Sequence, residues 1–224
     1  MRYAELPCLA DIVGQPPARH LTAYVTAVRR QKAASKCIAL VGDPGTGKTA
    51  SALATARELD CTYEVGGMWG GLLEVDCSQF GVDKCDELFR STLRLRPQSE
   101  LGWKVLILDE FERISPACQV KLKFWLDDSR LLPKLTVIAT SNDLDGISEA
   151  LLDRFDIMPY ESGVHFMAAC QQRLKSLWSR AVHGEGLPDG MTAWGRTIGR
   201  DGFSMRAALR CLEEALAERE CVPA

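Results

Sequence analysis

The eight residues GDPGTGKT at 42–49 limit the possible folds of this chain more than any other feature. They fit the pattern G-x-x-x-x-G-K-[ST], follow an apolar run at 37–41, and open a helical pattern at 48–59. A strand that leads through a glycine-rich turn into a helix gathers backbone N–H groups at the helix N-terminus, where anions are stabilised. The sequence therefore predicts a phosphate-binding loop between a strand and a helix.

The last two residues of the motif supply its charge and its hydroxyl group. Lys48 can reach the β- and γ-phosphates of a nucleotide, and the Thr49 hydroxyl can ligate Mg²⁺. We therefore predict ATP and Mg²⁺ as ligands. The predicted nucleotide contacts in this segment are Asp43, Pro44, Gly45, Thr46, Gly47, Lys48, Thr49 and Ala50.

A second apolar run, at 104–108, ends in the acidic pair Asp109-Glu110, about 60 residues after the loop. Carboxylates at the carboxyl end of a parallel strand lie where such sheets bind ligands. Asp109 is predicted to hold Mg²⁺ through its water shell. Glu110 is predicted to orient or deprotonate the attacking water.

The alternation of apolar runs with helical patterns predicts an α/β fold with a parallel sheet. After residue 160 only helical patterns follow, and Ser204 is placed to cap the last of them. We predict a nucleotide-binding α/β domain at 1–162 and a three-helix lid at 163–224. The predicted strands are 37–41, 72–76, 104–108, 135–140 and 156–160, and the predicted helices are 48–59, 83–95, 116–128, 146–152, 164–182, 190–199 and 204–220.

The composition is that of an ordinary globular chain, with 46% hydrophobic and 25% charged residues. The net charge of -3 gives no direct argument for nucleic acid. No apolar run approaches the roughly 20 residues that span a bilayer, and the N-terminal segment lacks the features of a secretory signal. The nine cysteines show no C-x-x-C spacing, so we expect reduced thiols, a cytoplasmic location and no membrane partner.

The two motifs, GDPGTGKT and VLILDEF, together resemble those of the AAA+ family of ATPases. The resemblance implies a five-stranded parallel sheet in the order 5-1-4-3-2 and hydrolysis of ATP. It implies that Asn142, after the run at 135–140, senses the γ-phosphate or the attacking water. It also implies that Arg154 acts in a neighbour's site and Arg206 in its own. The segment LADIVGQ, with Val13 and Gly14, is similar to the one that wraps the adenine.

Within the family, the segments LEVDCS at 73–78 and DEFER at 109–113 resemble clamp-loader ATPase subunits, without the helical collar of those subunits. The next resemblance is to the Holliday-junction branch-migration motor. Both imply a ring or arc of roughly five to seven copies, with DNA and a clamp, helicase or other client protein as partners. The predicted function is therefore an oligomeric ATPase of DNA replication, repair or recombination.

Two other functions stay open. Trp69 in a glycine-rich loop, and Phe80 after the run at 72–76, suit either a polypeptide-threading ring or simple packing under their own loops. An ATP-switched scaffold with slow hydrolysis is the other alternative. A group of basic residues suits either a DNA-facing surface or a solvated helix face, and its members are Arg113, Lys121, Lys123 and Lys134.

Overall fold

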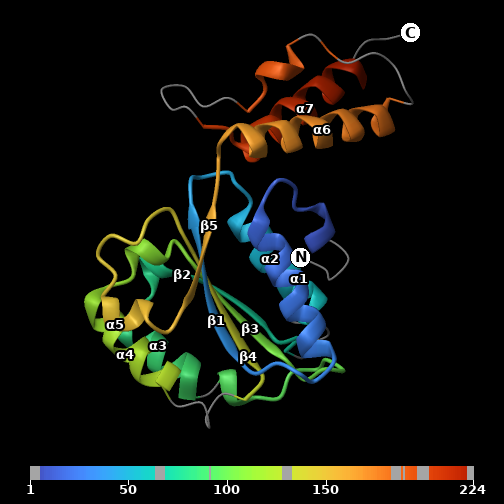
Figure 1. Cartoon of the computed structure of the whole chain (residues 1–224). Helices are drawn as coiled ribbons and strands as arrows, with labels where there is room; N and C mark the ends of the chain where they lie inside the picture. Colours follow the sequence, from blue (N-terminus) through green and yellow to red (C-terminus); the bar gives the residue numbers. More distant parts are fainter. Residues whose placement is uncertain are drawn as a thin grey trace.

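The structure is a computed structural model that describes residues 6–63, 69–90, 92–127, 133–182, 188, 190–195 and 202–220. A sheet with helices on both faces forms the larger part, and a helical part lies beyond the end of the last strand (Figure 1). None of the described helices is long and apolar enough to cross a membrane.

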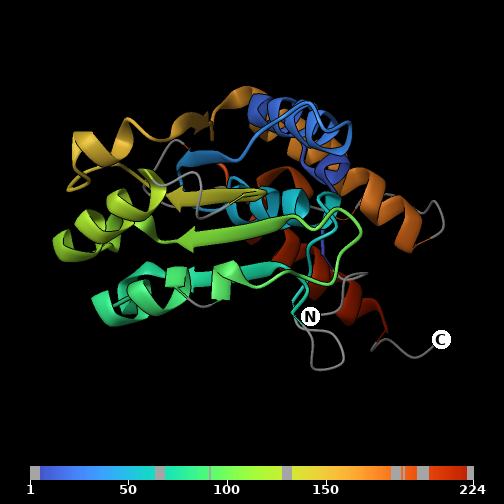
Figure 2. The same cartoon turned by 90° about the horizontal axis from the view of Figure 1, so that it is seen from below.

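Five parallel strands form the sheet, in the order β2-β3-β4-β1-β5. This is the predicted order 5-1-4-3-2 read from the other edge, so the prediction is confirmed. All the carboxyl ends therefore lie at one edge, as the matching direction of the arrowheads in Figure 2 shows, and the helical part lies beyond this edge (Figure 1). The strands are β1 (Lys36–Gly42), β2 (Leu72–Asp76), β3 (Lys104–Asp109), β4 (Leu135–Ser141) and β5 (Asp156–Tyr160).

Each face of the sheet has its own hydrophobic core, because successive side chains of a strand point to opposite faces. Ile38 and Ile107 pack under α1 (Pro16–Arg29) and α2 (Lys48–Glu58). Leu106 and Leu108 pack on the other face, with Phe89 and Leu122 of the helices there. Those helices are α3 (Val82–Arg90), α4 (Pro116–Asp127) and α5 (Glu149–Leu152). Four cysteines, Cys61, Cys77, Cys85 and Cys118, are buried in these cores as small apolar side chains.

Helix α1 is an element that the sequence analysis missed. It begins with two prolines, which suit the first turn of a helix because that turn has no intrahelical acceptor for its N–H groups. It buries Leu21, Val25 and Val28 against α2 and the sheet. This spacing of apolar residues is itself a helical pattern, and the prolines obscured it.

The helical part is built on α6 (Val164–Ala181) and α7 (Met205–Glu220), which bury Phe166, Trp178 and Phe203 between them. The predicted helix at 190–199 is wrong over its described residues. The 3-10 helix η6 (Met191–Ala193) ends at Trp194, and Gly195 has a φ of +82°. A Cβ on Gly195 would lie 2.7 Å from the Phe203 ring, so the chain turns there to let Phe203 in. Residues 196–199 lie outside the described ranges.

Direct contacts join the helical part to the glycine-rich loop. The Met205 N–H donates to the Gly45 carbonyl over 2.9 Å, and a Cβ on Gly45 would overlap the Ser204 hydroxyl. Ser162 donates to the Asp43 carboxylate. The Ser204 hydroxyl also accepts from the Ala207 N–H over 3.3 Å, as predicted for the cap of this helix. The start of α7 is therefore fixed on the loop itself.

Candidate active site

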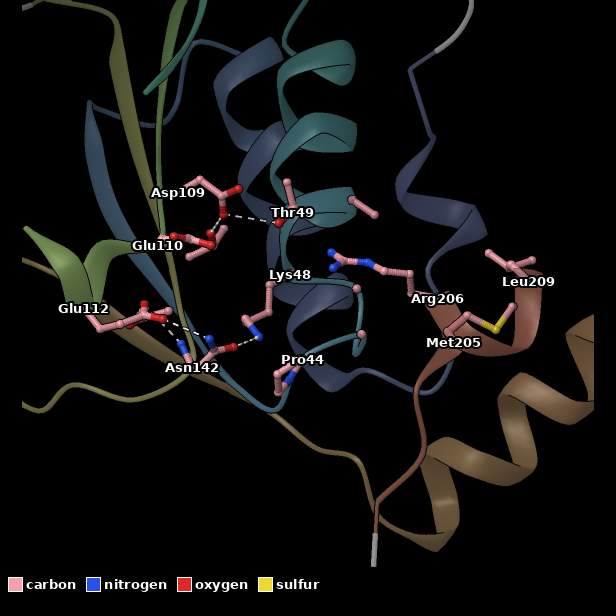
Figure 3. A pocket seen from close by; sticks show the side chains of 15 residues that line it. Pro44, Lys48, Thr49, Asp109, Glu110, Glu112, Asn142, Met205, Arg206 and Leu209 are labelled. Carbon is pink, nitrogen blue, oxygen red and sulfur yellow. Dashed lines mark hydrogen bonds between the residues drawn. The ribbon is translucent and has the colours of Figure 1, made fainter. Parts of the chain in front are cut away.

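A cavity of about 490 Å³ opens at the carboxyl edge of the sheet, between the glycine-rich loop, the ends of β3 and β4, and the start of α7 (Figure 3). Four segments far apart in the sequence meet in it, and most of the residues that the motifs predicted line it. The lining residues are Pro44, Gly45, Gly47, Lys48, Thr49, Ala50, Asp109, Glu110, Glu112, Thr140, Ser141, Asn142, Met205, Arg206 and Leu209.

The loop takes its shape from glycines in conformations that other residues rarely adopt. Gly45 and Gly47 have φ values of +80° and +99°, and Gly47 precedes the first residue of α2. The Thr46 hydroxyl donates to the Asp43 carbonyl over 2.8 Å and closes the turn. Asp43 and Thr46 thus stabilise the loop without lining the cavity, whereas Gly45, Gly47 and Lys48 line it.

Lys48 is a buried cation held by three acceptors. Its ammonium donates to the carbonyls of Gly42, over 2.5 Å, and Asp43, over 2.9 Å, and to Asn142 Oδ1 over 3.2 Å. Burial lowers the pKa of Lys48, while the charge of Glu112, and then that of Asp43, counteract part of this change. In this structure the ammonium is thus held by the loop that is predicted to bind phosphate.

Asp109 lies beside hydroxyl groups from two elements. Thr49 Oγ1 is 3.4 Å from Asp109 Oδ1, and the Thr140 hydroxyl donates to the same oxygen. Carboxylate and hydroxyl oxygens are ligands that suit Mg²⁺, which takes few protein ligands and completes its shell with water and phosphate. Within the described residues no group of three acidic, histidine or cysteine side chains could hold a metal ion. The residues present fit Mg²⁺ bound together with a nucleotide.

Glu110 lines the cavity and adopts an unusual backbone conformation. Its φ of +52° is rare for a residue with a side chain. Its carboxylate pairs with Arg113 over 3.1 Å, and 45% of its side chain is exposed. The turn at Glu110 sends Phe111 into the core and brings Glu112 back toward the end of β4.

Glu112 is a residue of the cavity that the sequence analysis did not single out. It lies in the 3-10 helix η5 (Phe111–Arg113) and accepts from Asn142 Nδ2 over 2.9 Å and from the Ser141 hydroxyl over 2.7 Å. Asn142 in turn accepts from Lys48. Figure 3 shows this chain of contacts from Glu112 through Asn142 to Lys48. The acidic residue in the segment DEFE was the only signal for it in the sequence.

Arg206 is the contribution of α7 to the cavity. Its guanidinium extends from α7 toward Lys48 and Thr49 (Figure 3). Its positive charge is among the causes that lower the pKa of Lys48. Two cations that repel each other across an open space indicate a site for an anion.

Val13 and Gly14 lie outside this cavity, against the helical part. Val13 packs on the core of α6 and α7, and a Cβ on Gly14 would lie 2.9 Å from the Ala169 Cβ. Gly14 also lines a separate cavity at the start of α1. Gln15 exchanges two hydrogen bonds with the backbone of Glu161, over 2.8 and 3.1 Å. This segment thus joins the two parts of the molecule.

Arg154 does not line the cavity of its own chain. It follows α5 and forms a two-pronged ion pair with Asp127 at the end of α4, over 2.6 and 2.7 Å. Its third donor group binds the Ala150 carbonyl. These contacts raise the pKa of Arg154 and lower that of Asp127.

Phe80 and Trp69 have different surroundings. Phe80 is 6% exposed and belongs to the core under α3 and α4. Trp69 is half-buried and packs against that core, next to residues 64–68, which lie outside the described ranges. Packing under the loop is therefore the better interpretation of Phe80.

Three of the four basic residues form contacts within the chain. Arg113 pairs with Glu110, Lys121 pairs with Asp86 over 2.9 Å, and Lys134 donates to the Leu101 carbonyl over 2.9 Å.

The chain is similar in sequence to two kinds of protein, whose names refer to replication and to Holliday junctions. It is 26% identical to the Holliday junction branch migration complex subunit RuvB of Treponema denticola, over 78% of this chain and 50% of that protein. It is 34% identical to the replication factor C small subunit of Thermoplasma volcanium, over 37% of this chain and 25% of that protein. The chain thus spans a quarter to a half of the length of these relatives.

Solved structures share the fold. Thermotoga maritima RuvB superposes with a TM-score of 0.69 at 18% identity, over 98% of this chain and 68% of the other. A structure titled "Structural Basis for Katanin Self-Assembly" gives a TM-score of 0.63 at 19% identity, over the whole of this chain and 76% of the other. The model of the ATPase family associated with various cellular activities (AAA) matches residues 38–161, more than half of the chain. The protein therefore belongs to the AAA family of ATPases.

Proposed function

We propose that this protein hydrolyses ATP with Mg²⁺ in an oligomer whose neighbouring subunits share nucleotide sites. The observation that carries the proposal is the cavity, which joins two cations, three carboxylates and an amide around one space, whereas Arg154 lies elsewhere. Such a set of groups is suited to stabilise the charge on a transferring phosphoryl group. An arginine supplied by a neighbour would complete it.

Each residue has a distinct part in this proposal. The loop N–H groups, Lys48 and Arg206 bind the phosphates, and Thr49 and Asp109 hold Mg²⁺, which would neutralise phosphate charge. The Glu110 carboxylate separates from Arg113 and then accepts the proton of the attacking water. Arg154 leaves Asp127 and binds the γ-phosphate of the adjoining subunit.

The proposed setting is DNA replication, repair or recombination, with DNA and a clamp, helicase or other client as partners. The support is the similarity to RuvB and to the replication factor C small subunit, whose names place those proteins in that setting. The basic residues add little, since three of the four are engaged within the chain. A polypeptide-threading ring has less support, because Phe80 is buried.

The test is an ATPase assay of the purified protein with and without primed and duplex DNA, with particle size measured in parallel. We expect hydrolysis that rises with protein concentration and with DNA. A rate of hydrolysis that is the same with and without DNA, and that is lost when Trp69 is substituted, would favour the threading ring instead. Tight ATP-dependent assembly with almost no turnover would favour a scaffold.

A further inference from the structure

The contacts of Asn142 determine which way its side-chain amide points. An ionised carboxylate only accepts hydrogen bonds, and an ammonium only donates them. Asn142 lies between the Glu112 carboxylate and the Lys48 ammonium. Its NH₂ group must therefore face Glu112 and its carbonyl oxygen must face Lys48. The opposite orientation would set two acceptors against each other on one side and two donors on the other.

This orientation has a consequence for the chemistry of the cavity. The group that Asn142 turns toward the position of the phosphates is an acceptor, Oδ1. A phosphate oxygen is also an acceptor, so Oδ1 cannot bind it. A water molecule can donate to Oδ1, once Lys48 has moved to the phosphates of a bound nucleotide.

We propose that Glu112 is a positioning residue that holds the Asn142 amide so that Oδ1 accepts a hydrogen bond from the attacking water. This inference rests on the proposed ATPase function and chooses between the two roles, phosphate contact and water contact, that the sequence left open for Asn142. The water oxygen bonds to the γ-phosphorus as the bond to the bridging oxygen breaks. Its proton passes to Glu110, and Asn142 takes none.

Glu112 is suited to this task by its place in the fold. It is fixed through η5, whose Phe111 side chain is fully buried, and it takes a second hydrogen bond from Ser141. Its contacts come from consecutive residues at the end of β4, and the backbone N–H of Asn142 also lies 3.4 Å from it. The carboxylate thus fixes the backbone and side chain of Asn142 together.

Exchanging the acid and the amide between positions 112 and 142 tests which residue of the pair donates the hydrogen bond, with the rate of ATP hydrolysis as the readout. In Glu112→Gln the new amide can donate or accept, so Asn142 is free to turn, and we expect turnover at saturating ATP to fall about tenfold. ATP affinity should change less than about threefold, because no phosphate contact is lost. Asn142→Asp sets two carboxylates against each other and should be more impaired. The double variant restores a donor at 112 and an acceptor at 142, and should recover at least about tenfold over Asn142→Asp.

The control is Glu100→Gln, which removes an exposed carboxylate before β3, at the opposite end of the sheet, and should leave turnover unchanged. If Asn142 donates to the γ-phosphate instead, the double variant places a carboxylate against phosphate. It would then be no more active than Asn142→Asp, and the proposal would be wrong. Full turnover of Glu112→Gln would overturn it as well.

A measurement without hydrolysis separates this inference from the proposed function. Asn142 is the only asparagine of the chain, so selective ¹⁵N-asparagine labelling gives a single pair of side-chain amide protons in NMR spectra. We expect one of them downfield, bonded to Glu112, and lost from that position in Glu112→Gln. The signal should stay there when ATP is bound to the Glu110→Gln protein. If ATP binding moved the Asn142 amide proton signal to the position seen in Glu112→Gln, the NH₂ group would have left Glu112. That result would overturn the proposal even if the wild type hydrolyses no ATP.

Discussion

Lys48 and Arg154 are both proposed to bind the γ-phosphate, Lys48 in the site of its own chain and Arg154 in the site of a neighbour, yet their surroundings differ sharply. Lys48 is 9% exposed and is held by acceptors from β1, the loop and the end of β4. Arg154 has 27% of its side chain exposed and is held by one acidic residue that is itself half in solvent. The difference fits the proposed function, in which one chain supplies most of a phosphate site and Arg154 comes from another copy.

The largest effect should come from removing the buried cation. Lys48→Ala is expected to abolish ATP binding, because the amine is the cation of the loop and nothing else in the loop replaces its charge. Binding of a fluorescent ATP analogue measures this directly. Lys32→Ala, at an exposed lysine after α1, is the matched control. Unchanged affinity of Lys48→Ala would show that the site has been misassigned.

The surface cation is expected to matter for rate. Arg154→Ala should lower the ATPase rate by roughly 10³–10⁵-fold, the range measured for arginine fingers. Arg180→Ala, at an exposed arginine of α6, should have no such effect.

Mixing decides whether Arg154 acts on a neighbour. Arg154→Ala and Lys48→Ala proteins should each be nearly inactive, and their mixture should regain activity, because one supplies the arginine and the other the intact loop. Co-assembly is checked by size. A mixed oligomer without activity, or full activity of Arg154→Ala alone, would exclude a shared site.

The proposed base should give a smaller loss. Glu110→Gln keeps the shape of the side chain and the pairing of Thr49 with Asp109, but the amide cannot accept the proton of the water. We expect ATP binding to persist and single-turnover hydrolysis to fall on the order of 10²-fold or more. Near-normal turnover would remove Glu110 from this role and direct attention to Glu112.

The smallest effect should come from Asp127. A solvent-exposed ion pair contributes little, so Asp127→Asn should lower the protein concentration needed for half-maximal ATPase rate by less than about fivefold. The change should vanish in the Arg154→Ala background, which serves as the control. A loss of rate at saturating protein would instead mean that Asp127 orients Arg154 for its neighbour.

The parts of the fold that were predicted from the sequence are those whose cause is local. The strands and the loop were predicted because the apolar runs and the motif at 42–49 lie within short segments, whereas the strand order was implied only by the resemblance to the AAA+ family. The predicted helix at 190–199 was wrong over its described residues because the ring of Phe203, eight residues after Gly195, occupies the space beside that glycine. Helix α1 was missed although its apolar spacing was present.

The candidate site was predicted less completely than the fold. The motifs indicated Lys48 and Asp109, and the structure brings both into one cavity. Glu112 lines that cavity after a turn in which Glu110 adopts a positive φ, and no glycine signals that turn in the sequence. The apolar side chains from α7 depend on the packing of the helical part, which no motif describes.

The hydrogen bond from the Met205 N–H to the Gly45 carbonyl fixes the first residue of α7 to the glycine-rich loop. Helix α7 has 16 residues, so at 1.5 Å per residue it is about 24 Å long. For a helix of that length, a rotation of about 10° at one end moves the other end by about 4 Å. We therefore expect a small adjustment of the loop around a nucleotide to displace the far end of α7 by a larger distance.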